Sequence, residues 1–335
     1  MAGHRYWRLF DYRVYSTFMG INEIELRLTA GGANQVGSGT AFASGSYQTF
    51  TPDKAFNLIT TDQWEQDIAG TTDNSGYGSF IGYDFGVGVT KDINEILVWP
   101  DSDFSAARTF ALFMLQSSDD NATWQNEYLC TYSSWVAGTP ILFTRPTIQA
   151  ANRYWGLLST VSQTGQLVAL SEFQQRIVAG GASVAVGGTA IGFDHFGTQA
   201  QALAFDADIN TYYAGQFNAP GGLVAYDYGA GITKSIVEYQ LTARNDASFA
   251  QGSTDGYALY SQDGKAWNIA KVYTGLTYAG AASAQIISIS APATSTARVG
   301  GLFAIVITLE NELPKVLTGF NLGGINHGKG LYIQS

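Results

Sequence analysis

Two groups of aromatic and polar residues, one in each half of the chain, have the chemistry to bind a sugar. Aromatic faces suit the C–H faces of a sugar, while amides and carboxylates suit its hydroxyls, and a ligand site combines both kinds of group. The alternative is that these side chains only close the end of a β-sandwich. The groups are Trp64, Gln66, Asp67, Asn74, Tyr77 and Trp99, and Tyr212, Tyr213, Phe217, Asn218 and Asn245. From them we predict the ligand-binding residues Trp64, Asp67, Asn74, Tyr77, Tyr212, Tyr213, Asn218 and Asn245.

Signatures of enzymes are weak. Asp84-Phe85-Gly86 imitates a kinase triplet, but no catalytic loop or glycine-rich nucleotide loop accompanies it. The three histidines lack metal-ligand spacing, and no Gly-x-Ser-x-Gly elbow is present. Paired carboxylates for glycoside hydrolysis stay open, since 27 acidic residues are available. Because the loop acids differ between the halves, we expect a protein that is not an enzyme.

The composition indicates an all-β fold. The 335 residues include 39 glycines, 19 tyrosines, 19 phenylalanines and 7 tryptophans, mostly among Thr, Val and Ile. Aromatic and β-branched residues fit pleated, half-buried surfaces, and glycines serve the turns between strands. A single helical turn or two is expected near residues 53–58. Short alternating strands such as 23–28, with more continuously apolar ones at 110–115 and 301–309, favour β-sandwiches of Greek-key or jelly-roll type.

Charge and sorting signals limit the partners and the location. The net charge is −10, and no run of Lys or Arg could neutralise a row of phosphates, so we expect no nucleic-acid partner. No stretch approaches 18 apolar residues, so membrane insertion is not expected. Cys130 is the only cysteine and is expected to be a buried apolar residue. Residues 1–10 contain no apolar segment of a secretory signal, which predicts synthesis in a cytoplasm without signal-dependent export.

The chain is a tandem duplication with a period of roughly 145 residues, a common size for one domain. Residues in the first half recur in the same order in the second, which makes chance a poor explanation. We expect Tyr6, Trp7, Tyr154, Trp155, Trp124 and Trp267 to be core residues. The matches are Arg5-Tyr6-Trp7 with Arg153-Tyr154-Trp155, Ala55-Phe56-Asn57 with Ala204-Phe205-Asp206, Tyr83-Asp84 with Tyr226-Asp227, and Ser117, Asp119 and Trp124 with Ser261, Asp263 and Trp267.

The repeat boundaries have two solutions, because Gly301 to Thr308 is a third, degraded copy of the segment that begins at Arg5. Cutting before the segment gives repeat one at 1–150, repeat two at 151–290, and edge strands with a glycine-rich tail at 291–335. Cutting after it gives 27–176 and 177–322. We favour the first division, and we expect at least one terminus to make contacts with another chain.

The repeated elements resemble one family. An Arg-Tyr-Trp strand, an acidic strand, an Ala-Phe-(Asp/Asn) loop, a Tyr-Asp-(Phe/Tyr)-Gly strand and a Ser-x-Asp hairpin before Trp are together similar to the discoidin, or coagulation factor 5/8 type C, family. The resemblance implies two tandem galactose-binding-like jelly-roll β-sandwiches that bind ligands, often glycans, through loops at one end. Modules that begin directly with Arg-Tyr-Trp-Arg-Leu resemble those of bacteriophage tail and virion structural proteins.

The resemblance also implies a structural Ca²⁺ near the Ala-Phe-Asp loop, where hard oxygen ligands lie close together in sequence. Repeat two keeps Asp206, Asp208 and Thr211 as candidate metal ligands. Repeat one departs from the pattern, because Asn57 replaces the aspartate and Leu58-Ile59 replaces the polar spacer. We therefore expect that no cofactor is required and that a structural calcium, if one binds, lies at 206–211 of repeat two and not at 57–61 of repeat one. The alternative for Asp206 and Asp208 is a turn whose carboxylates accept local backbone N–H groups.

The leading functional hypothesis is a non-enzymatic structural protein of a bacteriophage virion, in the tail fibre, baseplate or receptor-binding class. Its expected partners are other virion proteins and a host-surface glycan, its expected location is the virion, and a homo-oligomer is expected. The second hypothesis is a carbohydrate-binding accessory of a bacterial enzyme or surface assembly. The third is a glycan-cleaving enzyme on a sandwich scaffold. The missing secretory signal favours the first over the second, because virions leave the cell by lysis.

Overall fold

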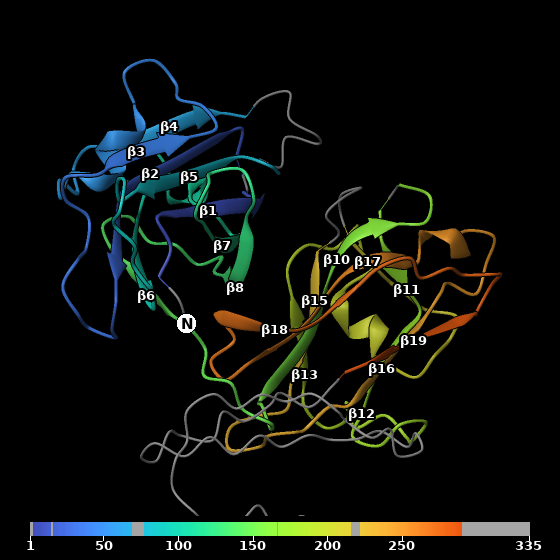
Figure 1. Cartoon of the computed structure of the whole chain (residues 1–335). Helices are drawn as coiled ribbons and strands as arrows, with labels where there is room; N and C mark the ends of the chain where they lie inside the picture. Colours follow the sequence, from blue (N-terminus) through green and yellow to red (C-terminus); the bar gives the residue numbers. More distant parts are fainter. Residues whose placement is uncertain are drawn as a thin grey trace, which may run out of the picture. The chain divides into compact units, whose positions relative to one another are not determined.

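The all-β prediction is confirmed by a computed structural model, which describes residues 3–14, 16–68, 77–102, 104–165, 167–215 and 222–289. In these ranges antiparallel strands are joined by loops and 3-10 turns, without an α-helix (Figure 1). No helix of the described residues is long and apolar enough to cross a membrane. The described residues all belong to one compact unit. The third copy of the edge segment, Gly301 to Thr308, lies outside the described residues.

Repeat one contributes strands to two antiparallel sheets. In spatial order, one contains β3-β5-β1-β7-β8 and the other β4-β2-β6-β9. The expected helical turn is the 3-10 turn η1 (Pro52–Phe56), and a second, η3, spans Ala106–Arg108. The strands are β1 (Tyr6–Arg13), β2 (Phe18–Arg27), β3 (Thr40–Ala43), β4 (Trp64–Asp67), β5 (Phe80–Asp84), β6 (Glu95–Pro100), β7 (Leu112–Ser118), β8 (Gln125–Thr131) and β9 (Ile141–Thr144).

Repeat two has the same order of strands in its larger sheet, β13-β15-β10-β17-β18, opposite β12-β16-β19 and the pair β11-β14. Its 3-10 turns are η4 (Gln201–Ala204) and η5 (Phe249–Gln251). The strands are β10 (Tyr154–Ser162), β11 (Ala169–Leu170), β12 (Glu172–Arg176), β13 (Thr189–Gly192), β14 (Tyr213–Ala214), β15 (Leu223–Asp227), β16 (Glu238–Thr242), β17 (Ser253–Ser261), β18 (Ala266–Tyr273) and β19 (Ala284–Ser288).

The duplicated Arg-Tyr-Trp strands occupy equivalent places. Trp7 lies opposite Tyr83 in the first ladder, and Trp155 lies opposite Tyr226 in the second. Both tryptophans are buried, and each indole N–H donates to a lysine carbonyl. Each preceding arginine forms a two-pronged ion pair, Arg5 with Asp84 and Arg153 with Asp227, with shortest N–O distances of 2.6 and 2.7 Å. The repeated charges therefore join the first strand of each repeat to its neighbour.

Each repeat has its own core between its sheets, as period-two alternation requires. The first core is built around Trp7, Trp64 and Phe113, and the second around Trp155, Tyr213 and Tyr239. Cys130 is fully buried in the first core, as expected. The expectation was wrong for Tyr6 and Tyr154, which are partly exposed because alternation turns them to the outer face of their sheet.

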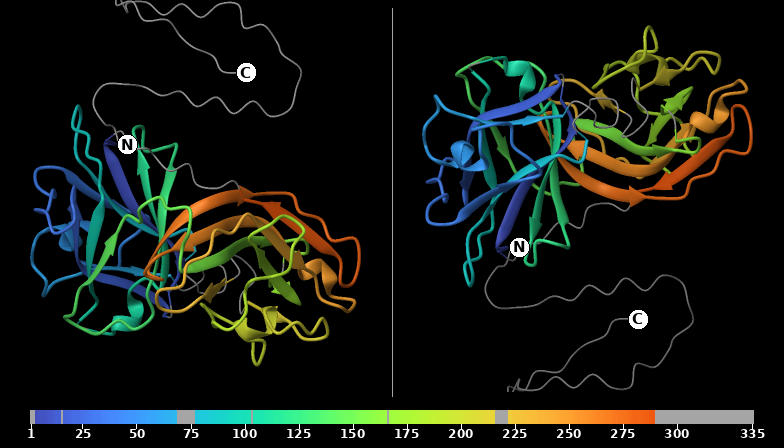
Figure 2. Two further views of the ribbon diagram at one scale, coloured as in Figure 1. Left: turned by 90° about the horizontal axis from the view of Figure 1, so that it is seen from below. Right: turned by 90° about the horizontal axis from the view of Figure 1, so that it is seen from above.

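The two larger sheets are joined edge to edge into one ten-stranded sheet, a connection that the sequence did not predict (Figures 1 and 2). The edge strands β8 and β18 pair at Cys130 with Ala266 and at Leu129 with Trp267. The outer faces of the two halves then bury a third apolar cluster against each other. Its buried members are Tyr12, Leu112, Met114 and Leu129 from repeat one, and Leu158, Leu223, Ala225, Leu259 and Trp267 from repeat two.

Polar contacts fix the register of this internal interface. The Arg13 guanidinium pairs with the Asp194 carboxylate at 2.5 Å, and the two side chains are 2% and 3% exposed. The Trp267 indole N–H donates to the Thr131 hydroxyl at 3.0 Å, and Asn126 donates to the Tyr257 hydroxyl at 3.1 Å. A buried pair tolerates little displacement, because separating the charges would leave each without compensation. The two repeats are therefore packed as one body.

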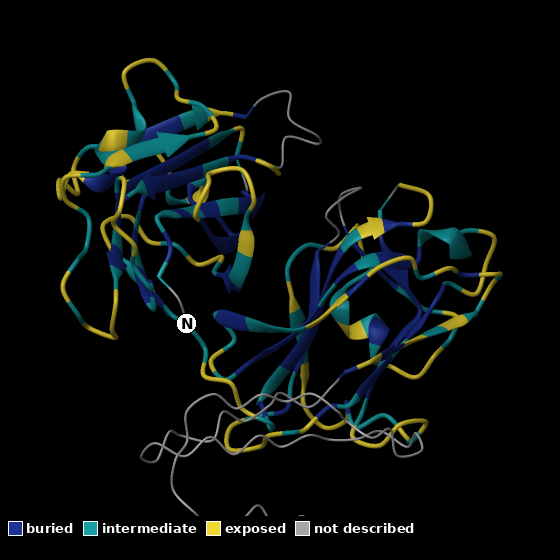
Figure 3. Cartoon of the chain, in the orientation of Figure 1, coloured by how far each residue is buried: buried dark blue, intermediate teal, exposed yellow. Residues whose placement is uncertain are grey.

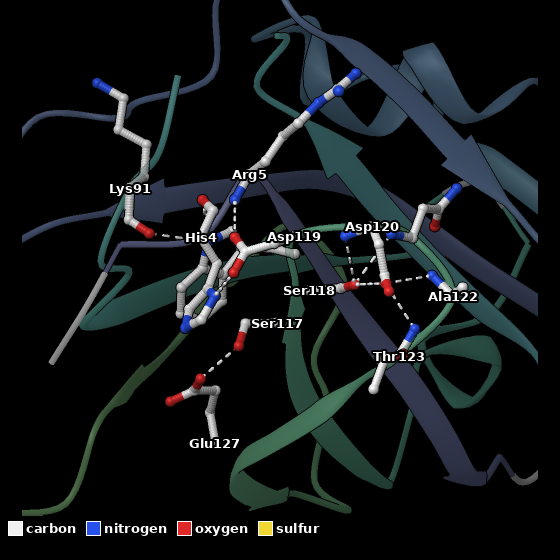
Figure 4. A network of polar contacts seen from close by, with 12 residues as sticks. His4, Arg5, Lys91, Ser117, Ser118, Asp119, Asp120, Ala122, Thr123 and Glu127 are labelled. Atoms are coloured by element: carbon white, nitrogen blue, oxygen red, sulfur yellow. Dashed lines mark hydrogen bonds and ion pairs between the residues drawn. The ribbon is translucent and has the colours of Figure 1, made fainter. Parts of the chain in front are cut away.

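The hydrogen bonds of the two hairpins before Trp124 and Trp267 show that the sequence alignment of these hairpins is wrong by one residue. Figure 4 shows the hairpin of repeat one. Ser118 and Asp120, rather than Ser117 and Asp119, form the turn in repeat one: Ser118 donates to Asp120, which accepts the backbone N–H groups of Ala122 and Thr123. Ser261 and Asp263 make the same contacts in repeat two. Asp119 instead bonds to His4 and to the backbone N–H of Arg5. Two consecutive Ser and two consecutive Asp made both alignments fit the sequence.

The expectation of a core role holds for Trp267 and is wrong for Trp124. Trp267 is 0% exposed in the interface between the repeats. Trp124 is partly exposed, and its ring lies 3.9 Å from the Arg8 guanidinium carbon. Both lie on the outer face of their sheet, so only the packing of one repeat on the other distinguishes them.

Candidate functional site

The predicted ligand residues of repeat one are not grouped at the surface. Trp64 begins β4, is 0% exposed and donates its indole N–H to the Gly45 carbonyl at 2.9 Å, so its assignment to a ligand surface is corrected to the core. Asp67, at the end of the same strand, is exposed. Tyr77 is 39% exposed and packs against Phe10 and Tyr12 beside the interface between the repeats. Asn74 lies outside the described residues.

Repeat two keeps two of its predicted ligand residues near the surface. Tyr213 is 1% exposed in β14 and belongs to the second core, so its assignment is also corrected. Tyr212 is partly exposed, with the Arg244 guanidinium 3.8 Å above its ring. Asn245 is exposed and donates to the Asn210 side chain at 3.1 Å. Asn218 lies outside the described residues.

The three predicted metal ligands lie together on the loop after η4, where Asp206 and Asp208 are exposed and Thr211 is partly exposed. Exposed residues gather mainly in the loops of the protein (Figure 3). Asp206 accepts the backbone N–H of Asp208 at 2.9 Å and the hydroxyl of Thr211 at 2.7 Å. Asp208 accepts the backbone N–H of Asn210 at 3.0 Å. A positive φ of 61° at Ala207 turns the chain between the two aspartates. The local turn expected as the alternative is therefore present, and it also gathers the oxygens that a cation would use.

A buried acid on the neighbouring strand β12 faces this loop. Glu172 is 8% exposed, and its Oε1 has no hydrogen-bond partner in the described part of the chain. Burial raises the pKa of Glu172 to about 7, and repulsion from Asp206 and Asp208 adds to this effect. The loop and the strand therefore bring together three carboxyl groups without a basic side chain to offset them.

The same place in repeat one has a built-in cation. Glu23 corresponds to Glu172, is 1% exposed, accepts the backbone N–H of Leu58 at 2.9 Å, and has a pKa raised to about 7 by burial. Here Asp62 pairs with the Lys54 ammonium at 3.1 Å and also accepts the Asn57 amide at 3.2 Å. Leu203 stands in repeat two where Lys54 stands in repeat one. Within the described residues, the equivalent loop therefore has its own positive charge in repeat one and none in repeat two.

Oxygen ligands of this kind suit Ca²⁺, which takes carboxylate, hydroxyl and carbonyl oxygens in flexible geometry. Within the described residues no group of three or more His, Cys, Asp or Glu side chains is arranged to hold a metal ion. As they stand, Asp206, Asp208 and Glu172 are therefore not placed to ligate one ion together, so a calcium site would require a local shift of these side chains and would also use Thr211 and backbone carbonyls. Such an ion would satisfy the unpartnered Oε1 of Glu172; because Glu23 Oε1 is also unpartnered, the absence of a counterpart to Lys54 is what distinguishes repeat two.

The sequence reasoning missed Glu172 and Arg244 as members of these two sites. For Glu172 the signal was present: an acid recurs on the strand in both repeats, yet it was used only to recognise the family. For Arg244 there was no signal, because the corresponding residue of repeat one is Asp101 and the loops differ.

Comparison with protein-family models, with curated proteins and with solved structures gives no match for this chain.

Proposed function

We propose that the chain is a non-enzymatic structural and binding protein of a bacteriophage virion, of the tail fibre, baseplate or receptor-binding class. The observation that supports this proposal is the fusion of the two repeats through one sheet and one buried interface. A fused pair of β-sandwich-like modules holds its loops at a fixed spacing, as a structural protein that must transmit force within a virion requires. Flexible linkage would serve a catalytic accessory better, because such a module must follow its enzyme over the substrate.

The second candidate is a carbohydrate-binding accessory of a bacterial enzyme or surface assembly. The surface group of Tyr212, Arg244 and Asn245 favours it, since an aromatic ring, a guanidinium and an amide recognise sugar hydroxyls and C–H faces. The same group serves the first proposal as a host-glycan site. The two functions therefore differ in location more than in binding chemistry.

Within both proposals the ion in repeat two is structural. Glu172, Asp206, Asp208 and Thr211 would hold Ca²⁺, which would neutralise the acidic loop and fix the neighbouring Tyr212 and Asn210. The ion supplies positive charge, and the chain supplies oxygens and a turn of fixed shape.

Location decides between the two candidates. Antibodies raised against the protein should label purified particles of the phage that encodes it, and electron microscopy should place the label on the tail or capsid. Label on a bacterial surface or on a secreted enzyme complex, with none on particles, contradicts the virion proposal and supports the accessory one. A glycan array with wild-type protein and with Tyr212→Ala and Asn245→Ala variants tests the binding surface in either case.

A further inference from the structure

The outer face of each larger sheet has two parts, which the strand ladders allow to be compared between repeats. In repeat one, face A covers the beginning of β1 and the neighbouring strands β5 and β3, and face B covers the end of β1 and the strands β7 and β8. In repeat two, the corresponding strands are β10, β15 and β13 for face A, and β10, β17 and β18 for face B. Face A consists of Tyr6, Arg8, Phe42, Phe80 and Trp124 in repeat one, and of Tyr154, Gly156, Ile191, Leu223 and Trp267 in repeat two. Face B consists of Arg13, Leu112, Met114 and Leu129 in repeat one, and of Val161, Asp255, Tyr257 and Val272 in repeat two.

Inside the chain, face A of repeat two packs on face B of repeat one. Leu223 and Trp267 from the former share one apolar cluster with Met114 and Leu129 from the latter, and each is at most 1% exposed. The internal interface is therefore asymmetric: each repeat uses a different part of the same surface. Face A of repeat one and face B of repeat two have no counterpart in this cluster, apart from the partly buried Tyr257.

Face A of repeat one is an aromatic surface around the Arg8 guanidinium, and a second guanidinium, that of Arg5, lies 4.6 Å from its Tyr6 ring. The Arg8 guanidinium lies 3.9 Å from the Trp124 ring and 4.7 Å from the Phe80 ring, and Phe42 contacts both rings. All four side chains are partly exposed. The surface is continuous with the internal interface, because Arg8 also lies over Phe10, which packs against the buried cluster.

Face B of repeat two is open and apolar around a single acid. Val161 and Val272 are 40% and 54% exposed, whereas the corresponding face in repeat one is buried. Asp255 lies opposite Val161 in the ladder and is partly exposed. Its carboxylate accepts only the backbone N–H of Gly275 and the hydroxyl of Thr254 within the described residues.

The two open faces carry opposite charges at positions where the internal interface has uncharged residues; the ion pair of the internal interface, Arg13 with Asp194, lies elsewhere. Arg8 stands where repeat two has Gly156, and Asp255 stands where repeat one has Leu112. In the described part of the chain Arg8 bonds to Gln116 and to no carboxylate, although the protein carries a net charge of −10. An arginine among aromatic rings and an aspartate among valines each gain from an opposite charge when they are removed from water.

We propose that face A of repeat one docks on face B of repeat two in a second copy of this chain, with Arg8 meeting Asp255. The contact reproduces between chains the pairing of face A with face B that the two repeats make within one chain. It is heterologous, so a pair of copies retains one unused face A and one unused face B, and the assembly grows into a ring or a filament. This inference does not depend on the virion location proposed above, since a soluble accessory protein would assemble in the same way.

Solution mass of the full chain, followed by light scattering over a range of concentrations, tests the proposal. The wild-type mass should rise with concentration, and the variants Trp124→Glu and Val272→Glu should each stay monomeric. Val87→Glu is the matched control, because Val87 is 85% exposed and belongs to neither face, and it should assemble like wild type.

Mixing the two monomeric variants distinguishes this contact from any other. Trp124→Glu retains an intact face B and Val272→Glu retains an intact face A, so an equimolar mixture should form a dimer and stop there. A mixture that stays monomeric overturns the head-to-tail contact, and so does the loss of assembly in only one of the two variants while the other still assembles. A wild-type chain that is monomeric up to its solubility limit overturns the proposal altogether. The virion location and the glycan binding proposed above are tested separately, by particle labelling and by the glycan array. Arg8→Asp offers a second face A variant, whose assembly with an Asp255→Arg chain should be restored if both fold.

Discussion

Trp267 and Trp124 provide a matched pair for measuring what the internal interface contributes to stability. They occupy equivalent positions after equivalent hairpins, but Trp267 is 0% exposed while Trp124 is partly exposed beside Arg8. Replacing a buried tryptophan by alanine costs about 3–5 kcal/mol through lost burial and the cavity left behind. Replacing a partly exposed one, with one cation–π contact, costs about 1–2 kcal/mol.

We therefore expect Trp267→Ala to lower the free energy of unfolding by about 2–3 kcal/mol more than Trp124→Ala does. Urea unfolding, followed by far-ultraviolet circular dichroism and extrapolated to water, measures this difference. The protein should be dilute enough to be monomeric, so that self-association does not contribute. Equal losses for the two variants would refute the reasoning, because they would mean that the outer face of repeat two is not buried by repeat one.

Three further outcomes follow from the charged groups. Asp194→Asn should cost about 3–5 kcal/mol, because it leaves Arg13 buried without its partner, while the double variant with Arg13→Met should recover part of that loss in urea unfolding. Ca²⁺ at a hundredfold excess over its dissociation constant should stabilise the wild-type protein by about 2.7 kcal/mol. Glu172→Gln should reduce this stabilisation, whereas the matched variant Glu23→Gln should leave it unchanged. Thermal unfolding at increasing calcium concentrations measures both outcomes. Without calcium, stability should fall as pH rises from about 4.5 to about 7, because both glutamates hold their protons in the folded state to about pH 7 and lose them near 4.5 when unfolded. Glu23→Gln and Glu172→Gln should each flatten that fall, and unchanged pH profiles would contradict the burial argument.

The local alternation of apolar and polar residues was enough to predict the strands and the residues that form the cores. Alternation in Trp7 and Leu9, or in Ile24 and Leu26, defines which side of a strand is buried, since side chains on a strand alternate between faces. The duplication identified Arg5 and Asp84 as residues with repeated roles, and both repeats use them in the same ion pair.

The continuously apolar segment 110–115 was correctly expected to be buried on both faces, but the reason lies in the tertiary structure. β7 is buried along its whole length because repeat two covers its outer face. Neither the hydrophobic pattern nor the strand propensity of a segment indicates which other part of the protein will cover its apolar face. That depends on how segments far apart in the sequence pack together.

The predicted ligand-binding and metal-binding residues also depend partly on local sequence and partly on tertiary structure. Residue types marked Asp206, Asp208 and Thr211 as oxygen ligands close in sequence, and the turn does hold them together. Trp64 and Tyr213 have the composition of a sugar site, yet folding placed them in the cores, since adjacent residues on a strand face opposite sides.

The sequence by itself determined the duplication, the all-β class and the difference between the acidic loops, because all three depend on residues near one another or on direct repetition. Only the tertiary structure decided that Trp267 is buried while Trp124 is open, that Glu172 faces the loop of Asp206, and that Arg13 pairs with Asp194. Those relations join residues that are far apart in the chain, and identical motifs acquire different surroundings when one repeat packs asymmetrically on the other.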